Sequence, residues 1–220
     1  SSAHCIAKII TRLGKSRKKF SFNKIPLQDS VLFSTFGGAT GTLKNRESYD
    51  MEKKLQEIAS HFALEGGIAA IDSLGEGFIN DTFIIRTEGE APDYILQRKN
   101  KNIFPDVPAM MDNIRRVTDH IRRGVIAAGG DPRREVMTVV PTREDALYHI
   151  DGDGEYWAVS VFIDDTVAYN KADSPELARK GGEGIGKFQA QLADFTEPLA
   201  ETIKGFHNIR HRFVQWDEAL

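Results

Sequence analysis

The feature that most limits how this chain can fold is a pair of glycines between two stretches that favour β-structure. Gly75 and Gly77 lie in Leu-Gly-Glu-Gly-Phe-Ile-Asn-Asp-Thr, residues 74–82. Apolar, β-prone residues at 68–74 and 80–87 predict two strands joined by this segment. Because glycine has no Cβ, backbone amides at such a turn can approach an anionic ligand closely. The segment indicates a hairpin over a polyphosphate, although an isolated glycine pair also fits an ordinary turn.

The surrounding pattern predicts an α+β fold, in which a long helix packs on an antiparallel sheet. A short amphipathic helix from residue 51 is expected to end at Gly66 and Gly67. Strands are expected at 68–74, 80–87, 93–98, 136–140, 146–150 and 156–163. The long helix would begin at Asp106 and Pro108, and a last helix at Ser174 and Pro175. The last helix should turn Leu177, Ile185, Phe188, Leu192 and Phe195 toward the core.

Charge divides the chain unevenly. Residues 1–46 hold nine Lys and Arg against one Asp, a net of +8, so the remainder carries −11 of the total −3. Met51 reads like an ordinary protein start, and residues 1–50 are therefore expected to be a disordered or non-native extension. A basic arm could instead bind nucleic acid or an anionic membrane. We expect neither partner.

The same composition favours a cytoplasmic protein. No run approaches eighteen apolar residues, so no membrane helix is expected, and the first residues lack the apolar core of a signal peptide. The single cysteine, Cys5, cannot form an internal disulfide.

Four segments in order resemble the aminoglycoside phosphotransferase superfamily, which has a protein-kinase-like fold. They are Leu-Gly-Glu-Gly-Phe-Ile-Asn-Asp-Thr-Phe (74–83), Tyr-Ile-Leu-Gln-Arg-Lys-Asn (94–100), Ile-Phe-Pro-Asp-Val-Pro-Ala-Met-Met-Asp-Asn-Ile (103–114) and Arg-Val-Thr-Asp-His-Ile-Arg (116–122). Within the superfamily the N-acetylhexosamine 1-kinase branch is the most similar. The resemblance runs roughly from Met51 to Leu220. It implies that ATP and Mg²⁺ are cofactors and that the acceptor is a small molecule, a sugar in the N-acetylhexosamine case.

The resemblance also implies roles for the residues near the glycines. The amides of Gly75 and Gly77 would cover the ATP phosphates, and Asn80 would rigidify the hairpin. The third strand would supply a cation that contacts the phosphates. We expect this to be Arg98, because its guanidinium group can bind two oxygens at once. Gln97 points the other way along the strand, and the register that would decide between them stays open.

Two further positions complete the implied nucleotide site. Asp112, in the first turns of the long helix, would orient Arg98 through an ion pair, although the helix dipole alone also explains an acid there. Phe162 to Asp165, including Asp164, would form the hinge whose backbone reaches the adenine. In the family the base that acts on the acceptor hydroxyl lies in a later His-Gly-Asp loop, followed by an Asn and a metal-binding Asp. No such triplet occurs in the 220 residues.

These implications divide the chain into three parts. Residues 1–50 are the basic extension, 51–165 the kinase-like N-terminal lobe with its hinge, and 166–220 the first helices of a truncated C-terminal lobe. As such a piece the chain should bind nucleotide but transfer no phosphate. The alternative is a noncatalytic module, complete at this length, that binds a nucleotide or a sugar.

A second glycine-rich segment, Gly181 to Lys187, matches the start of a P-loop. It ends in Phe188 where a P-loop needs a Ser or Thr hydroxyl for Mg²⁺, and it follows a helix start instead of a buried strand. We interpret it as part of a helix.

Overall fold

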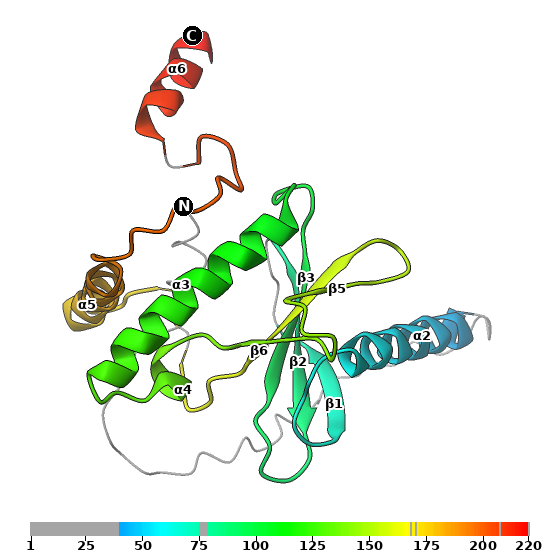
Figure 1. Ribbon diagram of the computed structural model, residues 1–220. Coiled ribbons are helices and arrows are strands. Elements are labelled where there is room, and N and C mark those ends of the chain that lie inside the picture. The colour runs from blue at the N-terminus through cyan, green and yellow to red at the C-terminus, as the bar shows by residue number, and fades with distance from the viewer. Residues whose placement is uncertain (1–39, 75–78, 168, 170, 207, 220) are drawn as a thin grey trace.

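The computed structural model describes residues 40–74, 79–167, 169, 171–206 and 208–219. The helices are α2 (Thr40–Ser60), α3 (Val107–Ala127), α4 (Pro132–Glu135), α5 (Pro175–Gln191) and α6 (Ile209–Ala219). The strands are β1 (Ile68–Ser73), β2 (Asp81–Thr87), β3 (Tyr94–Lys99), β4 (Val139–Val140), β5 (His149–Ile150) and β6 (Tyr156–Val161). Figure 1 shows α2 and α3 on either side of the sheet, with α5 and α6 beyond α3.

The sheet has the order β1-β2-β3-β6-β4, and β5 also pairs with β6. Every pairing is antiparallel, as the sequence predicts for an α+β fold. The first three strands form the predicted meander, whose turn between β2 and β3 contains Gly89 at a φ of 70°. This positive φ suits glycine because it has no Cβ to clash.

One face of the sheet packs against α2. Ile58 and Phe62 from the end of the helix lie in one buried cluster with Leu96 of β3 and Val159 of β6. Alternation along β3 decides which residues share this face, because successive side chains of a strand point to opposite sides. Tyr94, Leu96 and Arg98 therefore share the α2 face.

The other face packs against α3. Met110 and Met111 of the helix lie in a cluster with Ala158 of β6. The start of α3 is the predicted one, since the Asp106 carboxylate accepts a hydrogen bond from the Ala109 amide at 2.9 Å. An apolar stripe of Met110, Val117, Ile121 and Val125 is buried, but Ala128 caps the helix end and is exposed. Gln97 and Lys99 lie on this α3 face.

Two predicted strands are much shorter than expected. The expected strand 136–140 is reduced to Val139 and Val140 because a short helix, α4, precedes it. The Asp131 carboxylate caps α4 by accepting from the Arg133 amide, and Pro132 occupies its first turn. Val136 is the C-terminal cap of α4 and lies outside the strand. The expected strand 146–150 is likewise limited to His149 and Ile150.

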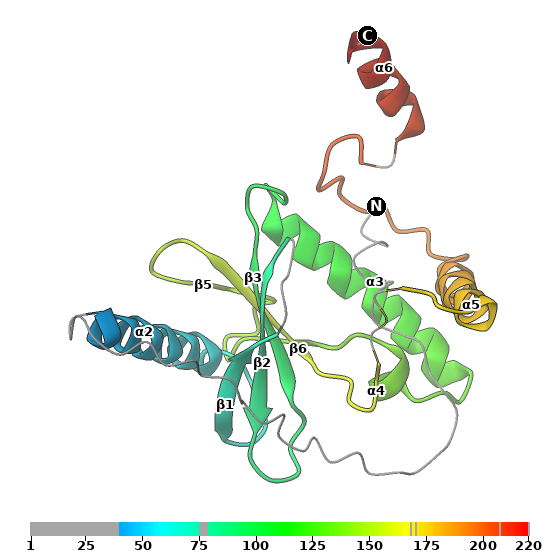
Figure 2. The same cartoon turned by 180° about the vertical axis from the view of Figure 1, so that it is seen from behind.

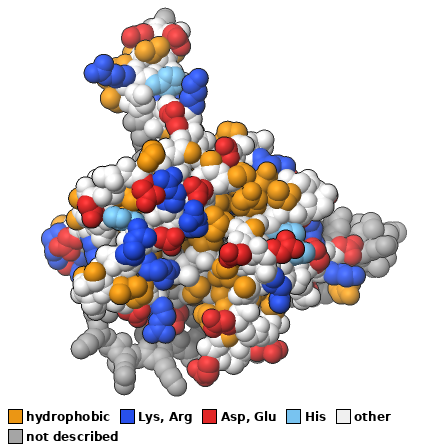
Figure 3. Space-filling model, in the orientation of Figure 1, with side chains coloured by type: hydrophobic (Ala, Val, Ile, Leu, Met, Phe, Trp, Pro, Cys, Tyr) orange, Lys and Arg blue, Asp and Glu red, His pale blue; other side chains and the backbone are white. Residues whose placement is uncertain are grey.

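The last two helices contain no buried residue. Ser174 caps α5 as predicted, accepting a hydrogen bond from the Leu177 amide at 3.1 Å. The P-loop-like glycines lie inside this helix, in agreement with the interpretation above. Ile185, predicted to face the core, is instead 52% exposed. Helix α6 projects from the rest of the molecule in both views and in the space-filling view (Figures 1, 2 and 3).

Helix α2 is continuous across the boundary expected between residues 50 and 51. Its described part begins at Thr40, and within residues 49–60, whose side chains are described, the first buried one is Leu55. No helix among the described residues is long and apolar enough to cross a membrane.

Candidate functional site

A hydrogen bond joins the residues on either side of the glycine segment, where β1 ends and β2 begins. The Leu74 amide donates to the Thr82 carbonyl at 2.8 Å and joins the end of β1 to β2. The Asn80 side-chain oxygen accepts from the Asn100 amide at 3.0 Å, which fixes the segment's exit to the end of β3. The hairpin role expected of Asn80 stays a prediction. Gly75 and Gly77 themselves lie outside the described residues.

A row of hydrogen-bonded polar side chains crosses β2 and β3 next to this hairpin base. The Lys99 ammonium donates to the side-chain oxygen of Gln97 (Oε1) at 2.7 Å. The side-chain nitrogen of Gln97 (Nε2) donates to the Thr82 hydroxyl at 3.1 Å. That hydroxyl reaches the Asn80 carbonyl at 3.4 Å. We call Asn80, Thr82, Gln97 and Lys99 the polar row. Its members come from two strands held in register, with Thr82 opposite Gln97.

The cation of this row is almost fully buried. Lys99 is only 8% exposed, although lysine is rarely buried without a partner. Removing an ammonium from water costs free energy unless polar or negative groups replace the water. The Gln97 carbonyl is one such group. Lys99 therefore places a positive charge at this end of the sheet.

Arg98 and Asp112, which were expected to form an ion pair that orients Arg98, are not in contact. Arg98 lies on the α2 face, where its partner is the Asp81 carboxylate, and both side chains are about half exposed. Asp112 pairs with Arg115 at 2.6 Å, one turn further along α3. Strand alternation causes this separation, since neighbours in β3 point to opposite faces. The predicted ion pair is thus replaced by two local ones.

Sequence reasoning passed over Lys99, although one signal for it was present. Residues 97 and 99 are two apart in a strand and must share a face, whichever face that is. If Gln97 faces the phosphates, Lys99 must face them as well. What the sequence could not supply was the register of β3 against β2 and β6, which comes from pairing with distant residues.

The expected hinge follows β6 and is tied at both ends. The Phe162 amide donates to the Asp93 carbonyl at 2.8 Å and so extends the pairing of β6 with β3. The Phe162 ring lies with its centroid 6.0 Å from the Arg86 guanidinium. Asp164 forms an ion pair with Arg134 of α4. Contact of this segment with an adenine remains a prediction.

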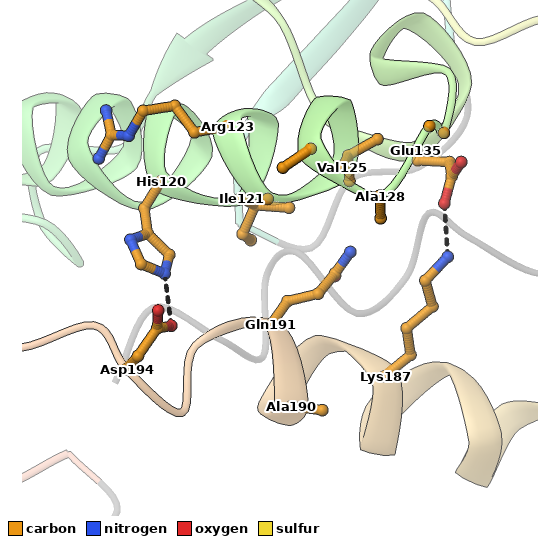
Figure 4. Close-up of a pocket in the computed structure, with 14 residues that line it drawn as sticks. His120, Ile121, Arg123, Val125, Ala128, Glu135, Lys187, Ala190, Gln191 and Asp194 are labelled. Atoms are coloured by element: carbon orange, nitrogen blue, oxygen red, sulfur yellow. Dashed lines mark hydrogen bonds and ion pairs between the residues drawn. The ribbon is translucent and has the colours of Figure 1, made fainter.

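A groove of about 820 Å³ lies between the C-terminal half of α3 and α5 (Figure 4). Two polar contacts bridge it. His120 of α3 lies 3.0 Å from Asp194, and Lys187 of α5 lies 2.5 Å from Glu135. The part of α3 that lines the groove is its C-terminal half, from His120 onward, and none of the polar-row residues lines it. The groove is therefore a separate feature of the surface.

The donor set of the polar row suits a phosphate but not a magnesium ion. An ammonium, an amide and a hydroxyl can all donate to phosphate oxygens. Mg²⁺ needs oxygen ligands and usually takes one or two carboxylates. None of the four side chains in the row is a carboxylate. Magnesium ligands would therefore have to come from elsewhere.

No protein-family model matches the chain. Among solved structures it is similar to a spectinomycin phosphotransferase crystallised with ADP and spectinomycin, with 14% sequence identity and a TM-score of 0.45. The similarity covers 66% of this chain and 38% of that one. The chain therefore spans well under half the length of that phosphotransferase.

Proposed function

We propose that this chain is the nucleotide-binding part of a cytoplasmic, ATP-dependent phosphotransferase whose acceptor is a small molecule, a sugar of the N-acetylhexosamine type. The observation that carries the proposal is the buried Lys99 ammonium, hydrogen-bonded to Gln97 in the polar row, beside the hairpin that contains Gly75 and Gly77. A phosphate group there would accept charge-assisted hydrogen bonds from the ammonium.

The order of elements supports the same proposal. Two strands joined by a glycine segment are followed by a third strand with a buried cation, and then by a long helix on the same face. This is the order that the resemblance to kinase-like phosphotransferases implies. In a dinucleotide-binding fold a helix would instead follow the glycines directly.

Each part has a proposed role. The amides of Gly75 and Gly77 cover the phosphates, and Lys99, in place of Arg98, neutralises their charge. Gln97 orients the ammonium by accepting its hydrogen bond. Asn80 holds the glycine segment against the end of β3. The backbone of residues 162–165 contacts the adenine.

Phosphate transfer requires groups that the polar row does not contain. A carboxylate must accept the proton of the attacking hydroxyl, and Mg²⁺ would bridge the phosphate oxygens when bound. The sequence has no His-Gly-Asp triplet to supply the first of these groups. We therefore propose that the 220-residue chain binds ATP and does not transfer its phosphate.

The test is calorimetric titration of the chain with ATP and MgCl₂, with AMP and with N-acetylglucosamine in separate runs. We expect ATP to bind more tightly than AMP, because the additional phosphates contact the glycine hairpin and Lys99. Gly77→Val should weaken ATP binding by about tenfold, the equivalent of about 1.4 kcal/mol. Gly152→Val is the matched control, since Gly152 is also a turn glycine and has open space around its Cβ position.

Three results would count against the proposal. Equal affinity for ATP and AMP would show that the additional phosphates of ATP make no favourable contacts. Binding of the sugar without ATP would favour the alternative, a noncatalytic sugar-binding module. ATP consumption above background in the presence of N-acetylglucosamine would contradict the proposal that the chain transfers no phosphate.

A further inference from the structure

A second group of chemically active side chains lies on the α2 face of the sheet, away from the polar row. It consists of Glu57 of α2, His61 directly after the end of α2, and His149 of β5, and their ligand atoms lie within 4.8 Å of one another. His149 is opposite Trp157 in the β5 and β6 pairing, and Trp157 belongs to the core beneath α2. The group is independent of the proposed nucleotide site.

The backbone around these residues is held by several contacts. Glu57 and His61 are four residues apart, so their side chains lie on the same side of the helix. The Arg143 amide donates to the His61 carbonyl at 2.8 Å, and the Ala63 amide donates to the Pro141 carbonyl at 2.9 Å. These bonds fasten the end of α2 to the segment that leads into β5. The two histidines meet because of the fold, although 88 positions separate them in the sequence.

The arrangement of the three side chains is close to that of a metal site. The His61 Nε2 lies 3.0 Å from a Glu57 carboxylate oxygen. Ligand atoms about 2.0–2.2 Å from a tetrahedral ion are roughly 3.4 Å apart, so the third ligand atom needs to move by little more than an ångström. The side chains of His61 and Glu57 are 42% and 61% exposed, which leaves them room to turn.

The two imidazole rings are stacked, with centroids 3.8 Å apart and planes 13° from parallel. A metal ion lies in the plane of each imidazole that binds it, so one ring must rotate out of the stack. Burial, assisted by the neighbouring His61, lowers the pKa of His149.

We propose that Glu57, His61 and His149 bind a divalent transition-metal ion of the Zn²⁺ or Co²⁺ type. Two imidazole nitrogens and one carboxylate oxygen suit such ions, whereas Mg²⁺ and Ca²⁺ prefer all-oxygen sites. Three protein ligands leave a further coordination position for water.

The experiment is calorimetric titration of the metal-free chain with ZnCl₂, together with visible absorption of the Co²⁺ form. Both are done in a Cys5→Ser background, because a thiol can itself bind zinc. We expect one Zn²⁺ to bind per chain. The Co²⁺ form should have the visible absorption spectrum of an ion bound by nitrogen and oxygen ligands in a site of low symmetry. His61→Gln and His149→Gln should each weaken Zn²⁺ binding by about tenfold or more, which corresponds to the loss of one of three ligands.

His120→Gln is the matched control. His120 also lies 3.0 Å from a carboxylate, that of Asp194, but the described residues bring no second histidine to it. This variant should bind Zn²⁺ like the parent chain. Because His61 is exposed, His61→Gln should melt within a few degrees of the parent and remain interpretable if His149→Gln unfolds. Absence of stoichiometric Zn²⁺ binding, or equal binding by the parent chain and His61→Gln, would overturn the proposal.

Discussion

The sheet with α2 and α3 differs sharply from the two C-terminal helices in how it is held together. In the sheet region, Phe62, Ile85 and Leu96 are completely buried in one cluster. Neither α5 nor α6 has a buried residue, and Trp216 of α6 is 64% exposed. Burial of apolar area is the main favourable term in folding. The stability of the chain therefore resides in the sheet region.

The segment that connects α5 to α6 is attached mainly by polar contacts to one side of α3. Asn113 donates to the Ala200 carbonyl at 2.8 Å and accepts from the Ala200 amide at 3.0 Å. Arg116 pairs with Glu197 at 2.8 Å. The apolar attachment is small and consists of Phe188, Leu192 and Phe195 against the end of α3. Polar contacts of this kind set position more than they add stability.

The largest effect should come from the core of the sheet region. Phe62→Ala removes a completely buried ring from the cluster between α2 and the sheet and should cost about 3–5 kcal/mol of unfolding free energy. Urea denaturation followed by circular dichroism measures this loss. A cost below about 1 kcal/mol would mean that α2 does not pack on the sheet as described.

A pH effect of about 2 kcal/mol should arise at the turn between β5 and β6. Burial opposes ionisation of Asp151, but hydrogen bonds from the Glu155 amide, the Trp157 indole and Lys54 outweigh it and lower its pKa from 3.8 to about 2. Because the folded-state pKa is the lower one, this stabilisation is present above about pH 4 and is lost as the pH falls to about 2.

Urea denaturation of Asp151→Asn between pH 6 and pH 2 tests this, because the variant cannot lose that contribution as the pH falls. Asp153→Asn is the control, since Asp153 also contacts Lys54 but its side chain is 74% exposed. Parallel pH profiles of Asp151→Asn and the parent chain would show that Asp151 contributes nothing in this range.

Asn113→Ala should loosen the C-terminal segment and leave the sheet intact. The substitution leaves the amide and carbonyl of Ala200 without their side-chain partners, at a cost of roughly 1–2 kcal/mol. We expect faster amide hydrogen exchange in residues 194–205 and unchanged exchange in β2 and β3. Arg123→Ala, an exposed position on the same helix, is the control. Faster exchange throughout the sheet would contradict the division into two regions.

The smallest effect should be found in α6. Phe213 is 63% exposed, so Phe213→Ala should change the unfolding free energy by less than about 0.5 kcal/mol. It is the matched counterpart of Phe62→Ala, with the same change of side chain. Thermal melting measures both. A loss of several degrees in Phe213→Ala would show that α6 is packed against other residues.

Local signals in the sequence predicted most elements, because caps and turns depend on neighbouring residues. Asp106 and Ser174 cap α3 and α5 as expected, and Gly89 forms its turn. Contacts between distant residues were not predictable in this way. Ile185 has the right spacing for a buried residue but is exposed, whereas Phe188 and Leu192 pack against the buried cluster at α3.

The candidate site shows the same limit. The sequence left open which face of β3 meets α3, and this follows from packing against Met110 and Met111. Gln97 and Lys99 lie on that face, whereas Arg98, the expected phosphate-binding cation, lies on the other. That either cation contacts a phosphate stays a prediction. The proposed metal-binding group was also out of reach, because 88 positions separate His61 from His149.

The most direct test of the account compares ATP affinity in two variants of adjacent residues, Lys99→Met and Arg98→Met. Both substitutions remove one positive charge from the end of β3, but the buried Lys99 lies in the polar row and Arg98 lies on the opposite face. We expect calorimetry with ATP and MgCl₂ to show binding weakened about tenfold or more by Lys99→Met and changed less than about twofold by Arg98→Met, with both variants folded. Equal losses, or a larger loss in Arg98→Met, would contradict the assignment of the phosphate site to the polar row.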